Sequence, residues 1–223
     1  LLRLYEEEED LSIYVILDMS SSMGFGRNKK VLYAKRMAAA LAYIGLANLD
    51  RVTLVTTTDH VMDRMPATRG KQRIFKVFQF LRSVHPDGTT DLGQALKAFV
   101  SQHKRRGLAI LLSDLYDPEG FEAGINVLRY NKFEPFVLHL LDAQDGKPPV
   151  RGDVRVYDCE TGEEREVTVT SRVLEKYREA YEKYVDDVRL FCTAKQVAYV
   201  PADIHVPFDD MVLRVLRRGG MVG

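Results

Sequence analysis

The sequence predicts an α/β fold of three layers, in which helices cover both faces of a doubly wound, mostly parallel sheet with one antiparallel edge strand. Short apolar runs rich in β-branched residues alternate along the chain with amphipathic helical stretches. The connections between these runs are long enough to hold helices, as parallel strands require. A small β-hairpin insertion, at about 151–170, departs from the alternation. We therefore expect one domain over residues 1–223.

The first expected strand, Leu11 to Leu17, is a short apolar run typical of a strand buried on both faces. The polar segment Asp18 to Gly24 is expected to form a loop, and a helix is expected from about Lys29 to Ala47. Arg51 to Thr58 follows as a strand. His60 to Met65, ended by the next proline, is expected as an antiparallel edge strand.

In the middle of the chain, helices are expected from about Lys71 to Val84 and from Leu92 to Lys104, separated by a turn that contains Pro86 and Gly88. The expected elements that follow are the strand Leu108–Leu112, a helix from Pro118 to Tyr130, the strand Pro135–Leu141, the hairpin strands Val154–Tyr157 and Glu166–Thr170, the helix Arg172–Lys195, the strand Val197–Val200 and the helix Phe208–Arg218.

Composition excludes several classes of protein. Lys plus Arg and Asp plus Glu both number 32, so no net charge attracts nucleic acid or an anionic membrane. The longest apolar run, Met37 to Ala47, is about half of what a bilayer-spanning helix needs. Cys159 and Cys192 do not make a disulfide framework or a zinc site. We expect a cytoplasmic location, free or as part of a longer membrane-anchored protein, with no membrane contact by this segment and no nucleic-acid partner. The acidic run Glu6 to Asp10 is expected to be a solvated lead-in.

Polar side chains stand where three of the expected elements meet one edge of the sheet. Asp18, Ser20 and Ser22 follow the first strand with the spacing DxSxS, Asp114 follows the strand Leu108–Leu112, and Thr90 precedes the helix that starts at Leu92. Ligands bind parallel sheets at the carboxyl ends of the strands. These groups are all oxygen donors, which favours a hard cation, Mg²⁺ best and Mn²⁺ or Ca²⁺ as substitutes.

Each piece also has an ordinary structural interpretation. Ser and Asp after a strand commonly cap the next helix or form turns. Asp114 is a possible N-cap for the helix at Pro118, and Thr90 or Asp91 for the helix at Leu92. Convergence of the pieces on one rim favours the metal site over separate caps.

These residues resemble the von Willebrand factor A fold and its metal-ion-dependent adhesion site, which combines DxSxS, a Thr from a second loop and an Asp after the fourth strand. The resemblance implies that the Ser20 and Ser22 hydroxyls bind the cation directly and that Asp18 and Asp114 act mostly through water. Thr90 would bind directly or through water. Because this loop has Gly-Thr-Thr, Thr89 is an alternative to Thr90.

A narrower likeness covers nearly the whole chain. Segments such as DMSSSMGFG, KKVLYAKRMAAALAYIGL, GTTDLGQAL, YDCETGEE and FDDMVLRVLRR are similar to the bacterial domain-of-unknown-function family fifty-eight. Its members often accompany MoxR-type AAA+ ATPases, so the resemblance implies such an ATPase as a partner. The likeness does not indicate a particular biochemical activity, because the family is defined without one.

Two functions follow from these observations. The first is a non-enzymatic, metal-dependent protein-interaction module, whose Mg²⁺ ion binds an Asp or Glu of a protein partner. The alternative is a Mg²⁺-dependent phosphohydrolase with Asp18 as nucleophile. Against the alternative, Ser20 stands where a second acid would be expected, and few basic residues lie in the loops to support transition-state charge.

Overall fold

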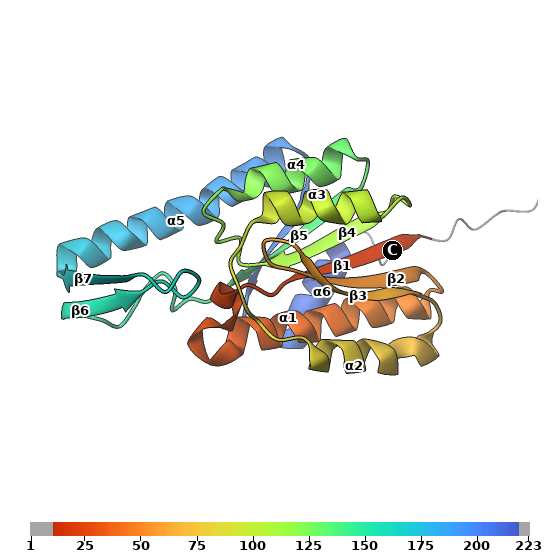
Figure 1. Ribbon diagram of the computed structural model, residues 1–223, viewed down its shortest axis with the longest axis horizontal. Coiled ribbons are helices and arrows are strands. Elements are labelled where there is room, and N and C mark those ends of the chain that lie inside the picture. Colours follow the sequence, from red (N-terminus) through yellow and green to blue (C-terminus); the bar gives the residue numbers. More distant parts are fainter. Residues whose placement is uncertain (1–10, 219–223) are drawn as a thin grey trace, which may run out of the picture.

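The computed structural model describes residues 11–218, apart from the side chains of residues 26–28, so the acidic run Glu6 to Asp10 lies outside the described residues. A six-stranded sheet has the order β3-β2-β1-β4-β5-β8, and a separate two-stranded sheet is formed by β6 and β7 (Figure 1). All pairings in the large sheet are parallel except that between β2 and β3. The predicted mostly parallel sheet with an antiparallel edge strand is therefore confirmed.

The strands have the following bounds: β1 Ser12–Asp18, β2 Arg51–Thr57, β3 Val61–Thr68, β4 Leu108–Ser113, β5 Glu134–Leu141, β6 Gly152–Tyr157, β7 Glu164–Val169 and β8 Ala198–Asp203. The helices have the following bounds: α1 Ser21–Ala47, the 3₁₀ turn η1 Lys71–Arg73, α2 Ile74–Ser83, α3 Leu92–Gln102, α4 Phe121–Tyr130, α5 Ser171–Ala194 and α6 Phe208–Arg218.

The central strand β1 is buried along its whole length, as its run of apolar residues predicts. It pairs in parallel with β2 on one side and β4 on the other, with Asp18 opposite Thr57 and Leu17 opposite Leu112. Because the strands run in the same direction, β1 and β4 end at the same edge of the sheet. This register places Asp18 beside Ser113, the last residue of β4.

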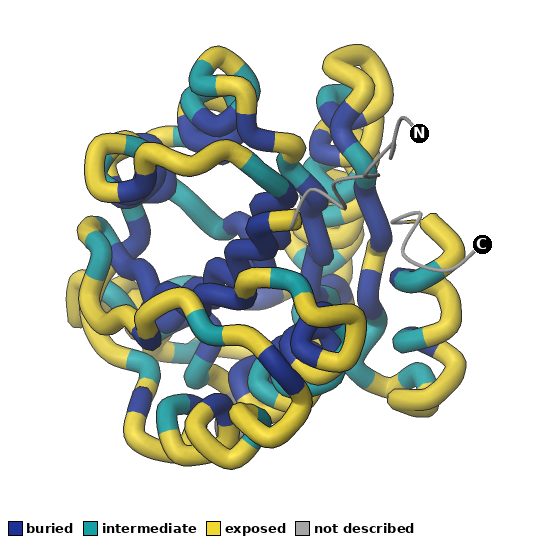
Figure 2. The backbone as a smooth tube through the Cα atoms, turned by 90° about the vertical axis from the view of Figure 1, so that its right-hand side faces the viewer, coloured by how far each residue is buried: buried dark blue, intermediate teal, exposed yellow. Residues whose placement is uncertain are grey.

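Helices cover both faces of the sheet (Figure 1). One apolar core lies between the sheet and α1, α2 and α6, and includes Met37, Leu41 and Met211. The other lies between the sheet and α3, α4 and α5, and includes Phe99 and Ile125. In Figure 2 the buried strands accordingly lie between layers that are exposed on their outer sides.

Three expected boundaries were wrong. Helix α1 begins at Ser21 rather than near Lys29, so most of the polar segment after β1 is helical. Strand β3 continues through Pro66 to Thr68, and an edge strand tolerates a residue that lacks an N–H. Its pairing with β2 is irregular at this point, between Val52 and Leu54. Helix α4 begins at Phe121, after a turn, rather than at Pro118.

The hairpin β6–β7 stands apart from the large sheet. It follows β5 and leads into α5, whose first half extends with it beyond the carboxyl ends of the central strands (Figure 1). Its two strands pair from Gly152 with Val169 to Tyr157 with Glu164. Among residues 11–218, no helix has both the length and the apolar character needed to cross a bilayer.

Candidate metal site

Two buried carboxyl groups lie side by side at the ends of the central strands. Asp18 and Asp114 are each 1% exposed. Asp18 Oδ1 accepts a hydrogen bond from the Ser20 backbone N–H at 2.9 Å, and Asp18 Oδ2 accepts one from the Ser113 hydroxyl. The end of β4 therefore fixes the side chain at the end of β1.

The two serines of the DxSxS segment connect these carboxyl groups. Ser20 Oγ and Ser22 Oγ are 3.0 Å apart, and Ser22 Oγ donates to Asp114 Oδ1 at 3.3 Å. Ser20 is the N-cap residue of α1, yet its side chain makes no capping hydrogen bond. This serine therefore caps the helix by position only, and its hydroxyl is directed to Ser22 instead. The four predicted residues Asp18, Ser20, Ser22 and Asp114 form one hydrogen-bonded cluster.

The loop that carries Thr90 is joined to the same cluster through the backbone. The Ser21 N–H donates to the Gly88 carbonyl at 3.0 Å, and the Asp87 N–H donates to the Met19 carbonyl at 2.8 Å. Thr90 is 5% exposed, whereas Thr89 is exposed. The structure thus favours Thr90 over Thr89 as the residue directed inward.

Thr90 donates hydrogen bonds to a residue that the sequence did not single out. Thr90 Oγ1 donates to Glu160 Oε1 at 2.7 Å, and its backbone N–H donates to Glu160 Oε2 at 2.9 Å. Glu160 lies in the turn between β6 and β7. The hairpin therefore brings a further carboxyl group to the rim of the sheet.

Helix caps account for the acids next to the cluster. Asp91 is the N-cap of α3 and accepts from the Gln94 N–H, as the sequence allowed. Asp117, from the loop after β4, accepts from the Leu92 N–H at 2.8 Å. Asp114 instead binds Ser22 and Lys30, so its interpretation as the cap of α4 was wrong.

A buried lysine balances part of the negative charge. Lys30, on α1, is 3% exposed, and its Nζ lies 2.7 Å from Asp114 Oδ2 and 2.9 Å from Asp145 Oδ2. The ammonium group also lies 4.8 Å from the centre of the Tyr116 ring. The two carboxylates raise the pKa of Lys30, although burial opposes them. Nothing in the sequence indicated this residue's role, because Lys30 stands next to Lys29 at the expected start of a helix, where solvated charges are common.

The loop after β4 is held in an unusual conformation. Leu115 has a φ of 60°, in the left-handed region that non-glycine residues rarely adopt. Its N–H donates to Ser113 Oγ at 2.8 Å, and the Tyr184 hydroxyl of α5 donates to its carbonyl. His139 Nε2 lies 3.1 Å from the Asp114 carbonyl oxygen. These contacts fix the backbone on either side of Asp114.

The cluster has the electrostatics of a cation site. Burial and the neighbouring Asp114 carboxylate raise the pKa of Asp18 from 3.8 to about 7. An ionised Asp18 thus lies in a costly environment that a cation would relieve. Among residues 11–218, no three His, Cys, Asp or Glu side chains are grouped as metal ligands. A cation held here would therefore depend on the hydroxyls of Ser20, Ser22 and Thr90, and such an all-oxygen set fits Mg²⁺.

Two hollows reach the cluster from the surface. One, of about 470 Å³, is lined by Ser22, Tyr116 and the hairpin residues Cys159 and Glu160. The other, of about 370 Å³, is lined by Ser22, Lys30 and Tyr116 together with the segment that follows β5. Ser22 therefore lies at the base of a surface that a second molecule can approach.

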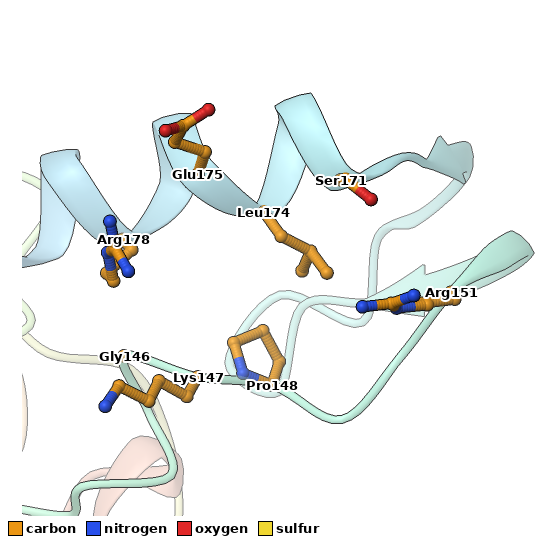
Figure 3. Close-up of a pocket in the computed structure, with 8 residues that line it drawn as sticks. All are labelled: Gly146, Lys147, Pro148, Arg151, Ser171, Leu174, Glu175 and Arg178. Atoms are coloured by element: carbon orange, nitrogen blue, oxygen red, sulfur yellow. The ribbon is translucent and has the colours of Figure 1, made fainter.

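A third hollow, of about 420 Å³, lies between that segment and the first turns of α5. In Figure 3 the side chains of Lys147 and Arg151 come from the segment, and those of Glu175 and Arg178 come from the helix. The three basic side chains outnumber the one acidic side chain. Pro148 lines both this hollow and the one of about 370 Å³, so the basic surface adjoins the cluster.

The strand order, the helices on both faces and the DxSxS segment at the carboxyl ends of β1 and β4 define a von Willebrand factor A-like fold. The chain matches the family described as "Protein of unknown function DUF58" over residues 1–189. The chain therefore belongs to the DUF58 family.

Solved structures share this fold at low sequence identity. An aerotolerance-related membrane protein from Bacteroides fragilis has a TM-score of 0.59 and 16% identity, covering 95% of this chain and 100% of that one. The conserved hypothetical protein BatB from Bacteroides thetaiotaomicron has a TM-score of 0.55 and 13% identity, covering 94% and 99%. Manganese-loaded TRAP protein from Plasmodium vivax has a TM-score of 0.51 and 15% identity, covering 93% and 72%.

Curated relatives come from mycobacteria. Uncharacterized protein Rv1480 of Mycobacterium tuberculosis is 26% identical over 186 residues, which are 81% of this chain and 58% of that protein. Uncharacterized protein MAV169 of Mycobacterium avium is 27% identical over 130 residues, covering 57% of this chain and 76% of that protein. The chain thus spans less than two thirds of the length of Rv1480.

The raised pKa of the buried Asp18 carboxyl predicts how the stability of the metal-free protein depends on pH. Its pKa is about 7 in the folded state against 3.8 for an ordinary Asp, so the folded state holds a proton that the unfolded state has released. The contribution of Asp18 to stability therefore falls as pH rises through this window, then stays constant above it. Asp18→Asn removes this dependence, and in EDTA above pH 7 the variant should be more stable than the wild type by a few kcal/mol.

Urea unfolding of both proteins between pH 4 and pH 8 measures this difference. Asp187→Asn on α5, where the side chain is half exposed, is the matched control and should leave the pH dependence of the wild type unchanged. A stability difference between wild type and Asp18→Asn that is constant across this range would contradict the account.

Proposed function

We propose that this chain is a Mg²⁺-dependent protein-interaction module that binds a carboxylate of a protein partner. The observation that carries the proposal is the convergence of Asp18, Ser20, Ser22 and Asp114 in one buried, hydrogen-bonded cluster. A protein-interaction role also agrees with the von Willebrand factor A-like fold.

The donor set explains why such a site would bind an acid. Ser20 and Ser22 offer neutral hydroxyls, and Lys30 already pairs with Asp114. The side chains that would hold the ion therefore neutralise it only in part, and a bound Mg²⁺ supplies residual positive charge for an incoming carboxylate. One such contact contributes a few kcal/mol, so the surrounding surface must supply the rest of the affinity and the selectivity.

The surface next to the cluster supports an acidic partner. Lys147, Arg151 and Arg178 line the hollow that adjoins the one containing Ser22 and Lys30. An acidic segment that places one carboxylate at the metal would have its neighbouring acids near these basic groups. The similarity in fold to a TRAP protein that was crystallised with manganese supports Mn²⁺ as a substitute for Mg²⁺.

A MoxR-type AAA+ ATPase, or a client that it remodels, is the partner we propose, in the cytoplasm. This part of the proposal rests on the family to which the chain belongs. The enzymatic alternative gains no support from the geometry. Asp18 is 1% exposed, and its two oxygens accept hydrogen bonds from Ser20 and Ser113, which does not suit a nucleophile that must reach a substrate.

Binding of a divalent cation should stabilise the fold. Because the folded state alone presents the assembled cluster, millimolar Mg²⁺ or Mn²⁺ should raise the melting temperature of the wild type, and Ser20→Ala should abolish that increase. Ser101→Ala is the matched control, since the hydroxyl of this exposed serine donates to the Ala98 carbonyl within α3, and it should respond as the wild type does. Differential scanning fluorimetry with and without EDTA measures the effect, and an equal increase in Ser20→Ala would count against the site.

Partner binding should need both the metal and the cluster. With the MoxR-type ATPase of the same organism on a biosensor surface, the wild type should bind in Mg²⁺ and lose at least about tenfold in affinity in EDTA, the loss of one charge-assisted contact. Ser22→Ala should bind equally weakly in both buffers. An ATPase affinity that EDTA leaves unchanged would refute the proposed mode of recognition.

A further inference from the structure

The turn of the β6–β7 hairpin reaches the rim of the large sheet through one side chain. Both oxygens of Glu160 are used there: Oε1 accepts from Thr90 Oγ1 at 2.7 Å and Oε2 accepts from the Thr90 N–H at 2.9 Å. Thr90 is the third hydroxyl residue of the proposed metal site. An acid of this chain thus already engages a group that the metal would use.

The turn is built so that Glu160 is held in this position. Asp158 Oδ1 accepts hydrogen bonds from the N–H groups of Glu160, at 2.8 Å, and Thr161, at 3.0 Å. The Asp158 N–H donates to the Glu163 carbonyl at 2.9 Å, and Gly162 takes the left-handed conformation that closes the turn, with a φ of 73°. The backbone of Glu160 is therefore fixed by its own loop, independently of the contact with Thr90.

The hairpin lies outside the large sheet. Its two six-residue strands pair with each other in one antiparallel ladder, and nine of the twelve residues are exposed. At its turn, however, Cys159 and Glu160 line the hollow that also contains Ser22. The contact that its turn makes with the rim is thus the feature that distinguishes this hairpin from a simple surface excursion.

We propose that Glu160 is an internal ligand of the metal site, and that it occupies the position which the carboxylate of a partner takes on binding. This inference rests on the proposed function. In the isolated chain the Glu160 carboxylate completes the oxygen set offered by Ser20, Ser22 and Thr90. A partner's acid then competes with Glu160, and the hairpin moves away from Thr90 as the partner binds.

Titration with Mn²⁺ alone tests this inference, with free Mn²⁺ followed by electron paramagnetic resonance and bound water by proton relaxation. Glu160→Gln keeps the shape of the side chain and removes its charge. It should weaken Mn²⁺ binding by about tenfold and add one exchangeable water to the bound ion. Glu163→Gln removes the same charge from the same turn, where the side chain is exposed and pairs with Arg165. This control should match the wild type in water number and lie within about twofold of it in affinity.

Acetate serves as a minimal substitute for the partner's acid. At millimolar concentration it should lower the proton relaxation of Mn²⁺ bound to Glu160→Gln, because it replaces the added water. It should have little effect on the wild type, where Glu160 already fills the position. A response to acetate that is equal in the two proteins would overturn the inference.

Failure of the inference and failure of the proposed function give different results. If the wild type binds Mn²⁺ and Ser20→Ala does not, but Glu160→Gln matches the wild type in affinity and bound water, Glu160 is only a structural partner of Thr90 and the inference is overturned. If the wild type binds no Mn²⁺, both the metal site and its internal ligand are refuted.

Discussion

The burial of two neighbouring carboxyl groups at the ends of β1 and β4 is the constraint on which the rest of the site depends. Asp18 and Asp114 are almost inaccessible, and the charge of one raises the cost of ionising the other. Several neighbouring groups reduce this cost. Ser113 and the Ser20 N–H donate to Asp18, while Ser22 donates to Asp114 and Lys30 pairs with it.

These contacts compensate the charges of Asp18 and Asp114 unequally. Asp114 has a buried ammonium group at 2.7 Å, whereas the Ser20 N–H and the Ser113 hydroxyl, which donate to Asp18, are neutral. A divalent ion beside Ser20 and Ser22 would compensate the negative charge of Asp18. The buried Lys30 would then keep the total negative charge low enough for the ion to attract a further carboxylate. The same two features, burial and partial neutralisation, would account for both the proposed metal binding and the proposed recognition of an acid.

Much of the fold, and the convergence of Asp18, Ser20, Ser22 and Asp114 at one edge of the sheet, follow from local sequence. The β-branched run in β1 predicts a buried central strand, and parallel strands bring the DxSxS segment and Asp114 to one edge by topology alone. Thr89 and Thr90 could not be separated in this way, because both are small polar residues in the same loop. Their difference lies in burial, which depends on how the loop after α2 bonds to Ser21 and Met19.

Glu160 and Lys30 could not be predicted, for a related reason. Glu160 is one of four acids in and beside a polar turn, and only the fold of the hairpin directs it to a residue 70 positions earlier. Lys30 follows Lys29 where the sequence indicated the start of a helix, and only the three-dimensional structure shows that its ammonium group pairs with Asp114 and Asp145.

A crystal of the protein grown with Mn²⁺, measured for anomalous scattering, tests the central claim most directly. The account predicts one strong anomalous peak within bonding distance of the Ser20 and Ser22 hydroxyls, with Asp18 and Asp114 in the surrounding shell. Anomalous peaks only at surface carboxylates remote from β1 and β4, in a crystal with a well-ordered cluster, would contradict it.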